Sequence, residues 1–175
     1  MKRGKKLLIN VSIIMAILLV IYYFGGYYLS KEQCITETLR AVYAYEKDVI
    51  MEFEHNNRSY TLLSNADQKT YSIVGTKKIG FLYHTDSSST GFQIKEEHGI
   101  DVFGMYNNDI GTVIFIYRND KSIAKVDAEL ENGDVITLDE WKSDYVGFLL
   151  EDSEWIKGTY KAYDDSKQLV EELER

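Results

Sequence analysis

The sequence contains no proline and a single cysteine among its 175 residues. One cysteine cannot form a disulfide within the chain, so the folded part must be stable without internal cross-links. Metal-ligand spacings are also missing, because none of the three histidines, His55, His84 and His98, forms an H-x-x-x-H pair. We therefore expect neither a cofactor nor a metal site.

Basic residues are scarce beyond the N-terminus. The first six residues hold four of the 20 Lys and Arg residues, which leaves 16 against 28 Asp and Glu from Ser30 onward, a net charge of −12. A surface of this sign repels phosphate polymers, so we expect no nucleic-acid partner. A well-solvated surface accounts for most of this charge.

The chain has one long uncharged run. Residues 7–24 carry no charge and would span roughly 27 Å as a helix, or about 34 Å with residues 25–29. A hydrocarbon core is about 30 Å thick. The basic flank of residues 1–6 favours a cytoplasmic N-terminus. The pattern predicts a single-pass membrane protein with a signal anchor over 7–29 and an extracytoplasmic remainder.

A cleaved signal peptide is the alternative interpretation of this run. Such peptides end at small residues in an A-x-A-like pattern, whereas the bulky Tyr23 and Phe24 precede Gly25 and Gly26. The sequence therefore favours an uncleaved anchor.

A short helix is predicted over residues 30–45, next to the membrane. Ser30 and Gln33 fit a capping box, and apolar residues follow at helical spacing. The stretch "SKEQC" lacks the small apolar residues that precede a lipid-attachment cysteine, so Cys34 is not expected to be lipidated. A helix N-terminus can lower a thiol pKa, so a reactive thiol or an intermolecular disulfide stays open.

Residues 46–175 show the two-residue alternation of strands. Gly111 to Arg118 is almost continuously apolar, which predicts a central strand. Asn132-Gly133 favours a tight turn between two strands, and a bulge there would bring Ile136 and Leu138 to the apolar face. The Ser-rich segment 84–91 is expected to be a polar loop. The fold class is mainly β: an N-terminal transmembrane helix and a short juxtamembrane helix precede an antiparallel β-sandwich.

The last third of the chain supports this class by resemblance. The segments "SIAKVDAELENGD", "YVGFLLED" and "GTYKAYDDSKQLVEE" resemble the closing hairpins of Ig-like extracytoplasmic domains. With the anchor, the layout is similar to small membrane-anchored proteins of Gram-positive bacteria without an assigned activity. The resemblance covers Ile123 to Glu172 and implies a final strand near 168–172, where periodicity alone also allows a helix.

Few residues suggest chemistry. Glu96, Glu97, His98 and Asp101 stand close together and could serve acid–base catalysis or hold a cation, although a solvated turn is the expected structure. No catalytic residue is assigned. Trp141 and Trp155 flank the last strands and form the candidate contact surface.

These observations favour a membrane-anchored interaction module, more consistent with a non-enzymatic role than with an enzyme. Its ligand would be a protein partner at the outer membrane face. The alternative is a tethered hydrolase or metal-dependent enzyme that uses the region of residues 96–101. A structural or stress-related envelope protein is a third possibility.

Overall fold

A computed structural model describes residues 2–44, 48–65, 70–95, 97–151 and 157–175. Within them the chain forms two helices, α1 (Lys2–Phe24) and α2 (Lys31–Ala41), and otherwise strands and turns. The strands are β1 (Tyr27–Tyr28), β2 (Asp48–His55), β3 (Arg58–Asn65), β4 (Thr70–Ile79), β5 (Leu82–Gln93), β6 (Ile100–Asn107), β7 (Gly111–Arg118), β8 (Ile123–Leu130), β9 (Val135–Leu138), β10 (Tyr145–Leu150), β11 (Gly158–Asp164) and β12 (Leu169–Glu174). The mainly β class is confirmed.

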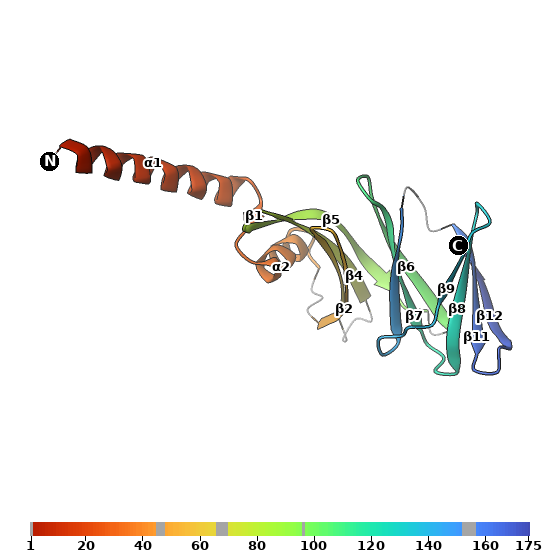
Figure 1. Ribbon diagram of the computed structural model, residues 1–175. Helices are drawn as coiled ribbons and strands as arrows, with labels where there is room; N and C mark the ends of the chain where they lie inside the picture. The colour runs from red at the N-terminus through yellow and green to blue at the C-terminus, as the bar shows by residue number, and fades with distance from the viewer. Residues whose placement is uncertain (1, 45–47, 66–69, 96, 152–156) are drawn as a thin grey trace.

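Helix α1 extends away from one end of the β body, and β11 and β12 lie at the other end (Figure 1). The helix ends at Phe24, and Gly26 (φ 64°) turns the chain into β1, so residues 25–29 do not lengthen the helix as predicted. Among the described residues, no helix combines the length and apolar character needed to cross a membrane. The transmembrane segment over 7–29 stays a prediction.

Helix α2 begins as the sequence predicts. The Oγ atom of Ser30 accepts a hydrogen bond from the Gln33 N–H at 3.1 Å, which satisfies one of the first free amides of the helix. The helix ends at Ala41, four residues before the predicted boundary. Its buried face packs through Ile35 and Leu39 against Leu63 of β3 and Val74 of β4.

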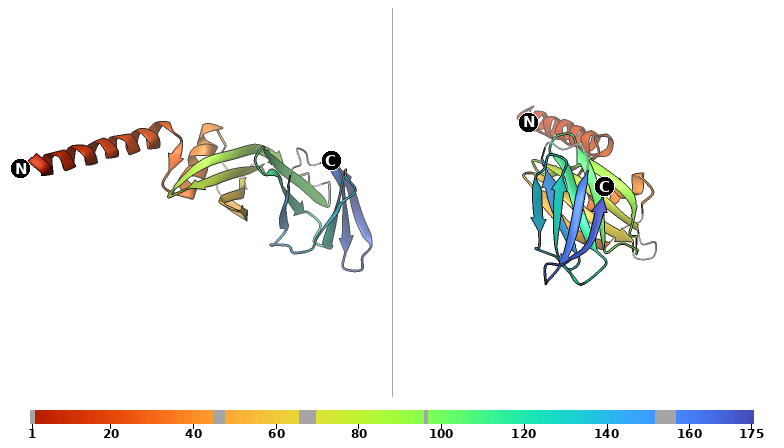
Figure 2. Two further views of the ribbon diagram at one scale, coloured as in Figure 1. Left: turned by 45° about the horizontal axis from the view of Figure 1, so that its top comes forward. Right: turned by 90° about the vertical axis from the view of Figure 1, so that its right-hand side faces the viewer.

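The described strands form three antiparallel sheets. Sheet A has the order β1-β5-β4-β3-β2, sheet B the order β10-β7-β6, and sheet C the order β12-β11-β8-β9. Figure 2 shows the sheets stacked beside one another, with α1 projecting from the sheet A end. The architecture is thus sandwich-like, with α2 covering the outer face of sheet A.

Sheet B is the middle layer because both of its faces are apolar. On β7, Ile114 and Ile116 pack into the core shared with sheet C, and Val113 and Phe115 pack into the core shared with sheet A. All four side chains are fully buried, and burial of each stabilises the fold by about 1.5–3 kcal/mol. The prediction that Gly111–Arg118 forms the central strand is confirmed.

The turn between β8 and β9 contains the expected irregularity. The Leu130 N–H donates to the Asp134 carbonyl at 2.8 Å and the Gly133 N–H donates to the Leu130 carbonyl at 2.9 Å, with Gly133 at φ 86°. This three-residue loop with a left-handed glycine is a bulged hairpin. It pairs Ile136 with Ala128 and thereby returns Ile136 to the apolar face.

Residues 84–91 and the C-terminal segment both form strands. Residues 84–91 were expected to form a loop, but β5 runs through them, because β4 pairs with this polar stretch, with bulges at Asp86 and Gly91. The C-terminal segment forms strand β12, which pairs with β11, as the Ig-like resemblance implied.

Candidate functional site

The side chains of Glu97, His98 and Asp101 do not converge on a common site. Glu96 lies outside the described residues, and the Glu97 side chain is 77% exposed. The His98 Nδ1 atom lies 3.2 Å from Oε1 of Glu171 on β12, and the other Glu171 oxygen accepts a hydrogen bond from the Ile100 N–H. These contacts fasten the turn before β6 to the last strand.

Asp101 is the buried member of this group. Its Oδ2 atom accepts hydrogen bonds from the Lys95 N–H at 2.8 Å and from Asn119 Nδ2 at 3.1 Å. Burial raises the pKa of the Asp101 carboxyl, while those hydrogen bonds act in the opposite direction. Through these hydrogen bonds the Asp101 carboxylate anchors a loop. In the part of the chain that the structure describes, no three His, Cys, Asp or Glu side chains are placed to hold a metal ion.

Trp155 lies outside the described residues, and Trp141 is committed to contacts within the chain. The Trp141 indole Nε1 donates to the Ala124 carbonyl at 2.8 Å, and the Arg118 guanidinium carbon lies 4.8 Å from the ring centroid. The ring is half-buried against the core between sheets B and C. Trp141 therefore fixes the chain segment between β9 and β10 and offers only part of its ring to a partner.

Cys34 lies on the inner face of α2 and is fully buried. Its Sγ atom lies 3.6 Å from Oγ1 of Thr85 on β5. Burial raises the pKa of the thiol, and the hydrogen bonds with Thr85 and Thr38 only partly oppose that effect. Cys34 is thus placed as a small apolar residue in the α2 interface and not as an accessible thiol.

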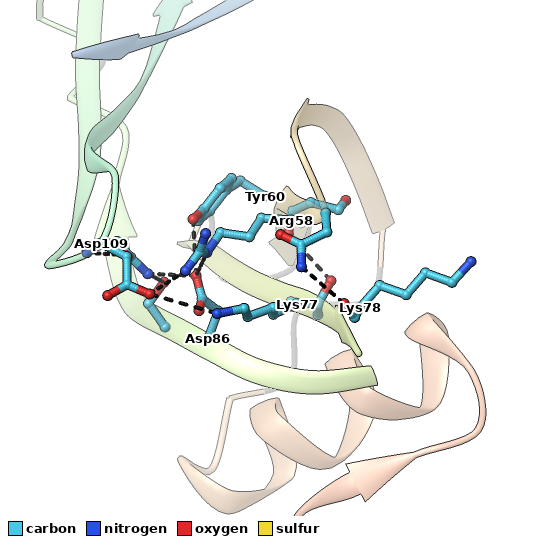
Figure 3. Close-up of polar contacts among 11 residues, drawn as sticks. Arg58, Tyr60, Lys77, Lys78, Asp86 and Asp109 are labelled. Atoms are coloured by element: carbon cyan, nitrogen blue, oxygen red, sulfur yellow. Dashed lines mark hydrogen bonds and ion pairs between the residues drawn. The ribbon is translucent and has the colours of Figure 1, made fainter. Parts of the chain in front are cut away.

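A polar cluster that the sequence did not reveal joins sheet A to the β6–β7 turn. Figure 3 shows the guanidinium of Arg58, the first residue of β3, between the carboxylates of Asp86 on β5 and Asp109 in the turn. Arg58 Nε donates to Asp86 Oδ2 at 2.9 Å, and Arg58 Nη2 donates to Asp109. We call this group, with Tyr60, Lys77 and Asn107, the Arg58 cluster.

The Asp86 carboxylate is the centre of the Arg58 cluster. Its Oδ2 atom also accepts hydrogen bonds from the Tyr60 hydroxyl at 3.0 Å and from Asn107 Nδ2 at 2.6 Å. Burial and the nearby Asp86 charge raise the pKa of Tyr60, so its hydroxyl keeps the proton that it donates. A buried carboxylate is tolerated where several donors surround it, and these donors come from both sheets. The cluster therefore acts as a lock between sheets A and B.

Two hollows adjoin the Arg58 cluster. One, of about 270 Å³, lies beside Asp86 and is lined by polar residues of β5 and the β6–β7 turn. The other, of about 250 Å³, lies at the β2–β3 turn on the side of Lys78 and Tyr83. Asn57 Nδ2 donates to the Lys78 carbonyl at 3.2 Å there. Both hollows are smaller than a typical pocket for a drug-sized ligand, about 300 Å³ or more.

An open groove of about 740 Å³ lies between β2 and the segment that links β9 to β10. We call it the acidic groove. Four carboxylate residues and a single Lys, Lys142, line it. Its lining residues are Met51, Glu52, Phe53, Glu54, Thr137, Leu138, Asp139, Glu140, Lys142, Val146 and Gly147.

Trp141 has a definite place relative to this groove. It stands between Glu140 and Lys142, which both line the groove, and its backbone N–H donates to the Asp139 carbonyl at 3.2 Å. The backbone contact and the half-buried indole of Trp141 thus hold the acidic wall in place. The sequence pointed to this neighbourhood through the tryptophan, but not to the carboxylates beside it.

Comparisons of this chain with protein-family models, with curated proteins and with solved structures find no match.

Proposed function

We propose that this protein is a single-pass membrane protein whose extracytoplasmic β domain binds a protein partner without catalysing a reaction. The observation that carries the membrane part is the surface of α1. The large apolar side chains between Leu7 and Val20 are all exposed, from 45% at Leu18 to 72% at Leu8. A helix that is apolar on every side requires an apolar environment, and a bilayer would supply it.

The direction of the anchor follows from charge. The four basic residues at positions 2–6 favour the cytoplasmic side, which leaves the acidic β domain outside. Gln33 Nε2 donates to the Tyr22 hydroxyl at 2.6 Å, so the end of α1 is tied to the start of α2. In this proposal α2 and sheet A lie nearest the membrane and sheet C lies farthest from it.

The binding role is supported by how the polar side chains are used. The Arg58 cluster and the contacts of His98 and Asp101 serve to join parts of the fold, whereas the acidic groove is open. We also assign sheets B and C, closed by the β11–β12 hairpin, to an Ig-like sandwich of the kind carried by small membrane-anchored proteins of Gram-positive bacteria. Such sandwiches commonly present binding surfaces at their ends and edges.

Membrane attachment is tested by fractionation. The full chain, produced in bacterial cells, should stay in the membrane pellet after an alkaline carbonate wash, and external protease should digest its β domain in spheroplasts. Replacing Leu8, Ile14 and Leu18 by lysine should release the chain into the soluble fraction. The same number of lysines at exposed positions outside α1, Tyr43, Val49 and Val135, is the matched control. Recovery of the wild-type chain in the wash would overturn the proposal.

The binding role is tested by proximity labelling in the native cells. The labelling enzyme is fused to the C-terminus of the full chain and, as control, directly after residue 29. We expect the full chain to enrich particular proteins over the anchor alone. Identical sets of labelled proteins would contradict a binding role for the β domain.

A further inference from the structure

We propose that the acidic groove binds a basic, extended segment of a protein partner, which adds a strand to the open edge of β10. This inference rests on the proposed binding function and names both the surface and the chemistry of its partner. Three features carry it: an open strand edge, a groove along that edge and an excess of negative charge.

The open edge follows from the order of sheet B. Among the strands that the structure describes, β10 pairs with β7 alone, so its other side is a sheet edge. The Tyr145 N–H and carbonyl bond to Lys142, away from β7, whereas the Asp144 carbonyl accepts from the Arg118 N–H of β7. Backbone groups alternate in direction along an antiparallel strand. The N–H and carbonyl groups of Gly147 and Leu149 therefore point to the same open edge as those of Tyr145.

The groove lies where an added strand would run. Gly147 and Val146 of β10 line it, together with Met51 of β2 and the segment from Thr137 to Glu140. Gly147 is only partly buried, and a Cβ atom there would meet Phe115 and Met51, so backbone alone lines the groove at this position. A volume of about 740 Å³ accommodates several side chains of an extended peptide. Main-chain pairing at a sheet edge with side-chain pockets beside it is a recurrent mode of peptide recognition.

The charge of the groove selects the partner. Glu52 is engaged by Lys31 and Ser59, so the exposed residues Glu54, Asp139 and Glu140 provide the attraction. Lysine or arginine side chains on the facing side of a peptide would complement these carboxylates. An acidic peptide or a phosphate polymer would be repelled, as it would be by the domain as a whole.

The probe for this proposal is a short labelled peptide of alternating lysine and valine. As a strand, such a peptide presents its lysines on one face and its valines on the other. Binding is measured by fluorescence anisotropy on the full chain in a neutral detergent. Two control peptides are used: one with glutamate in place of lysine, and one with the same charge but with methyl groups on alternate backbone nitrogens, which removes the N–H donors of one edge.

The protein variants isolate the groove from the total charge. Glu54→Lys combined with Glu140→Lys reverses two groove charges, and Glu172→Lys combined with Glu174→Lys makes the same change in net charge on β12. Strand β12 is the opposite edge strand of sheet C from β9. All four positions are exposed, so both double variants should fold, which circular dichroism verifies.

We expect the groove variant to bind the lysine peptide at least about tenfold more weakly than wild type, and the β12 variant to bind it as wild type does. The glutamate and N-methylated peptides should not bind. Equal binding of the N-methylated peptide would reduce the effect to ionic attraction and overturn strand addition. Equal weakening by both variants, or no binding of the lysine peptide, would overturn the groove assignment. Enrichment of a protein by the full chain in the labelling experiment would then keep the general binding role and move it to another surface.

Discussion

The guanidinium Nε atom of Arg58 lies 2.9 Å from the Asp86 Oδ2 atom, and the two side chains are only 9% and 10% exposed. Arg58 also contacts Asp109 in the β6–β7 turn, so one buried cation links two strands of sheet A to the edge of sheet B. A charge held in this way is well satisfied as long as its partners are present, and it becomes costly when one of them is removed.

Replacing Asp86 by alanine should therefore destabilise the protein strongly. The change leaves the buried Arg58 charge with Asp109 as its one carboxylate partner among the described residues, and it removes an acceptor of Tyr60 and Asn107. We expect the free energy of unfolding to fall by about 3 kcal/mol or more, as measured by urea denaturation. Glu37→Ala, which breaks the exposed Arg40–Glu37 pair on α2, is the control and should have little effect. Similar losses for the two variants would contradict the locking role of the cluster.

The buried Asp101 carboxyl should make the free energy of unfolding depend on pH. Burial raises its pKa in the folded state above the ordinary value of 3.8, so between these two pKa values the folded state binds more protons than the unfolded state. Its contribution to stability therefore falls as the pH rises through this window. Asp101→Asn should remove that loss, so the difference in unfolding free energy between variant and wild type should shift in favour of the variant as the pH rises above 3.8.

Asp144 is the control for Asp101, because its contribution to stability changes with pH in the opposite direction. Hydrogen bonds from Lys121 and Arg118 lower the pKa of Asp144, so its stabilising contribution is present above pH 3.8 and is lost as the pH falls through the lower folded pKa. Asp144→Asn should therefore shift the difference against the variant as the pH rises. Denaturant unfolding at a series of pH values gives both slopes. The same slope for both variants would show that the environment of Asp101 has been misassigned.

Cys34 should react slowly with thiol reagents. The side chain is fully buried, and burial raises the pKa of its thiol, so the thiolate is rare and shielded. We expect an aromatic disulfide reagent to modify it only when urea unfolds the chain, and non-reducing gels to show no disulfide-linked dimer. The comparison is a chain with Cys34→Ser and Thr36→Cys, which moves the thiol to an exposed position of α2. Equal rates for the two native chains would refute the buried placement.

Gly75 should not tolerate a side chain. A Cβ atom at this position of β4 would lie 2.6 Å from Ser87 Oγ and 2.8 Å from Cε1 of Tyr60. Tyr60 belongs to the Arg58 cluster and Ser87 Oγ accepts a hydrogen bond from Asn107 of that cluster, so the two neighbours cannot move apart freely. We expect Gly75→Ala to lower the unfolding free energy by about 1–3 kcal/mol, as measured by thermal or urea denaturation. Ser88→Ala on the exposed side of β5 is the control, and an equally small effect of both would count against close packing here.

Some of the fold could be predicted because its causes are local. The apolar run at Gly111–Arg118 has alternating side chains that are apolar on both sides, and only a middle layer can bury both sides of a strand. Residues 84–91 were misjudged for the complementary reason. Their serine and threonine side chains carry no apolar alternation, and it is pairing with β4 that makes them a strand. Asp86, the centre of the Arg58 cluster, was hidden inside that stretch.

The sequence by itself determined the cap of α2, the bulged turn at Gly133 and the central place of β7, since each depends on residues within a few positions of one another. Only the tertiary structure decided the polar lock and the groove. Arg58 meets partners 28 and 51 positions away, and the acidic groove combines β2 with the segment between β9 and β10. Burial of a charge and opposition of two strand edges depend on how the sheets stack, and this stacking arises from the sum of all apolar contacts and not from any single stretch of the chain.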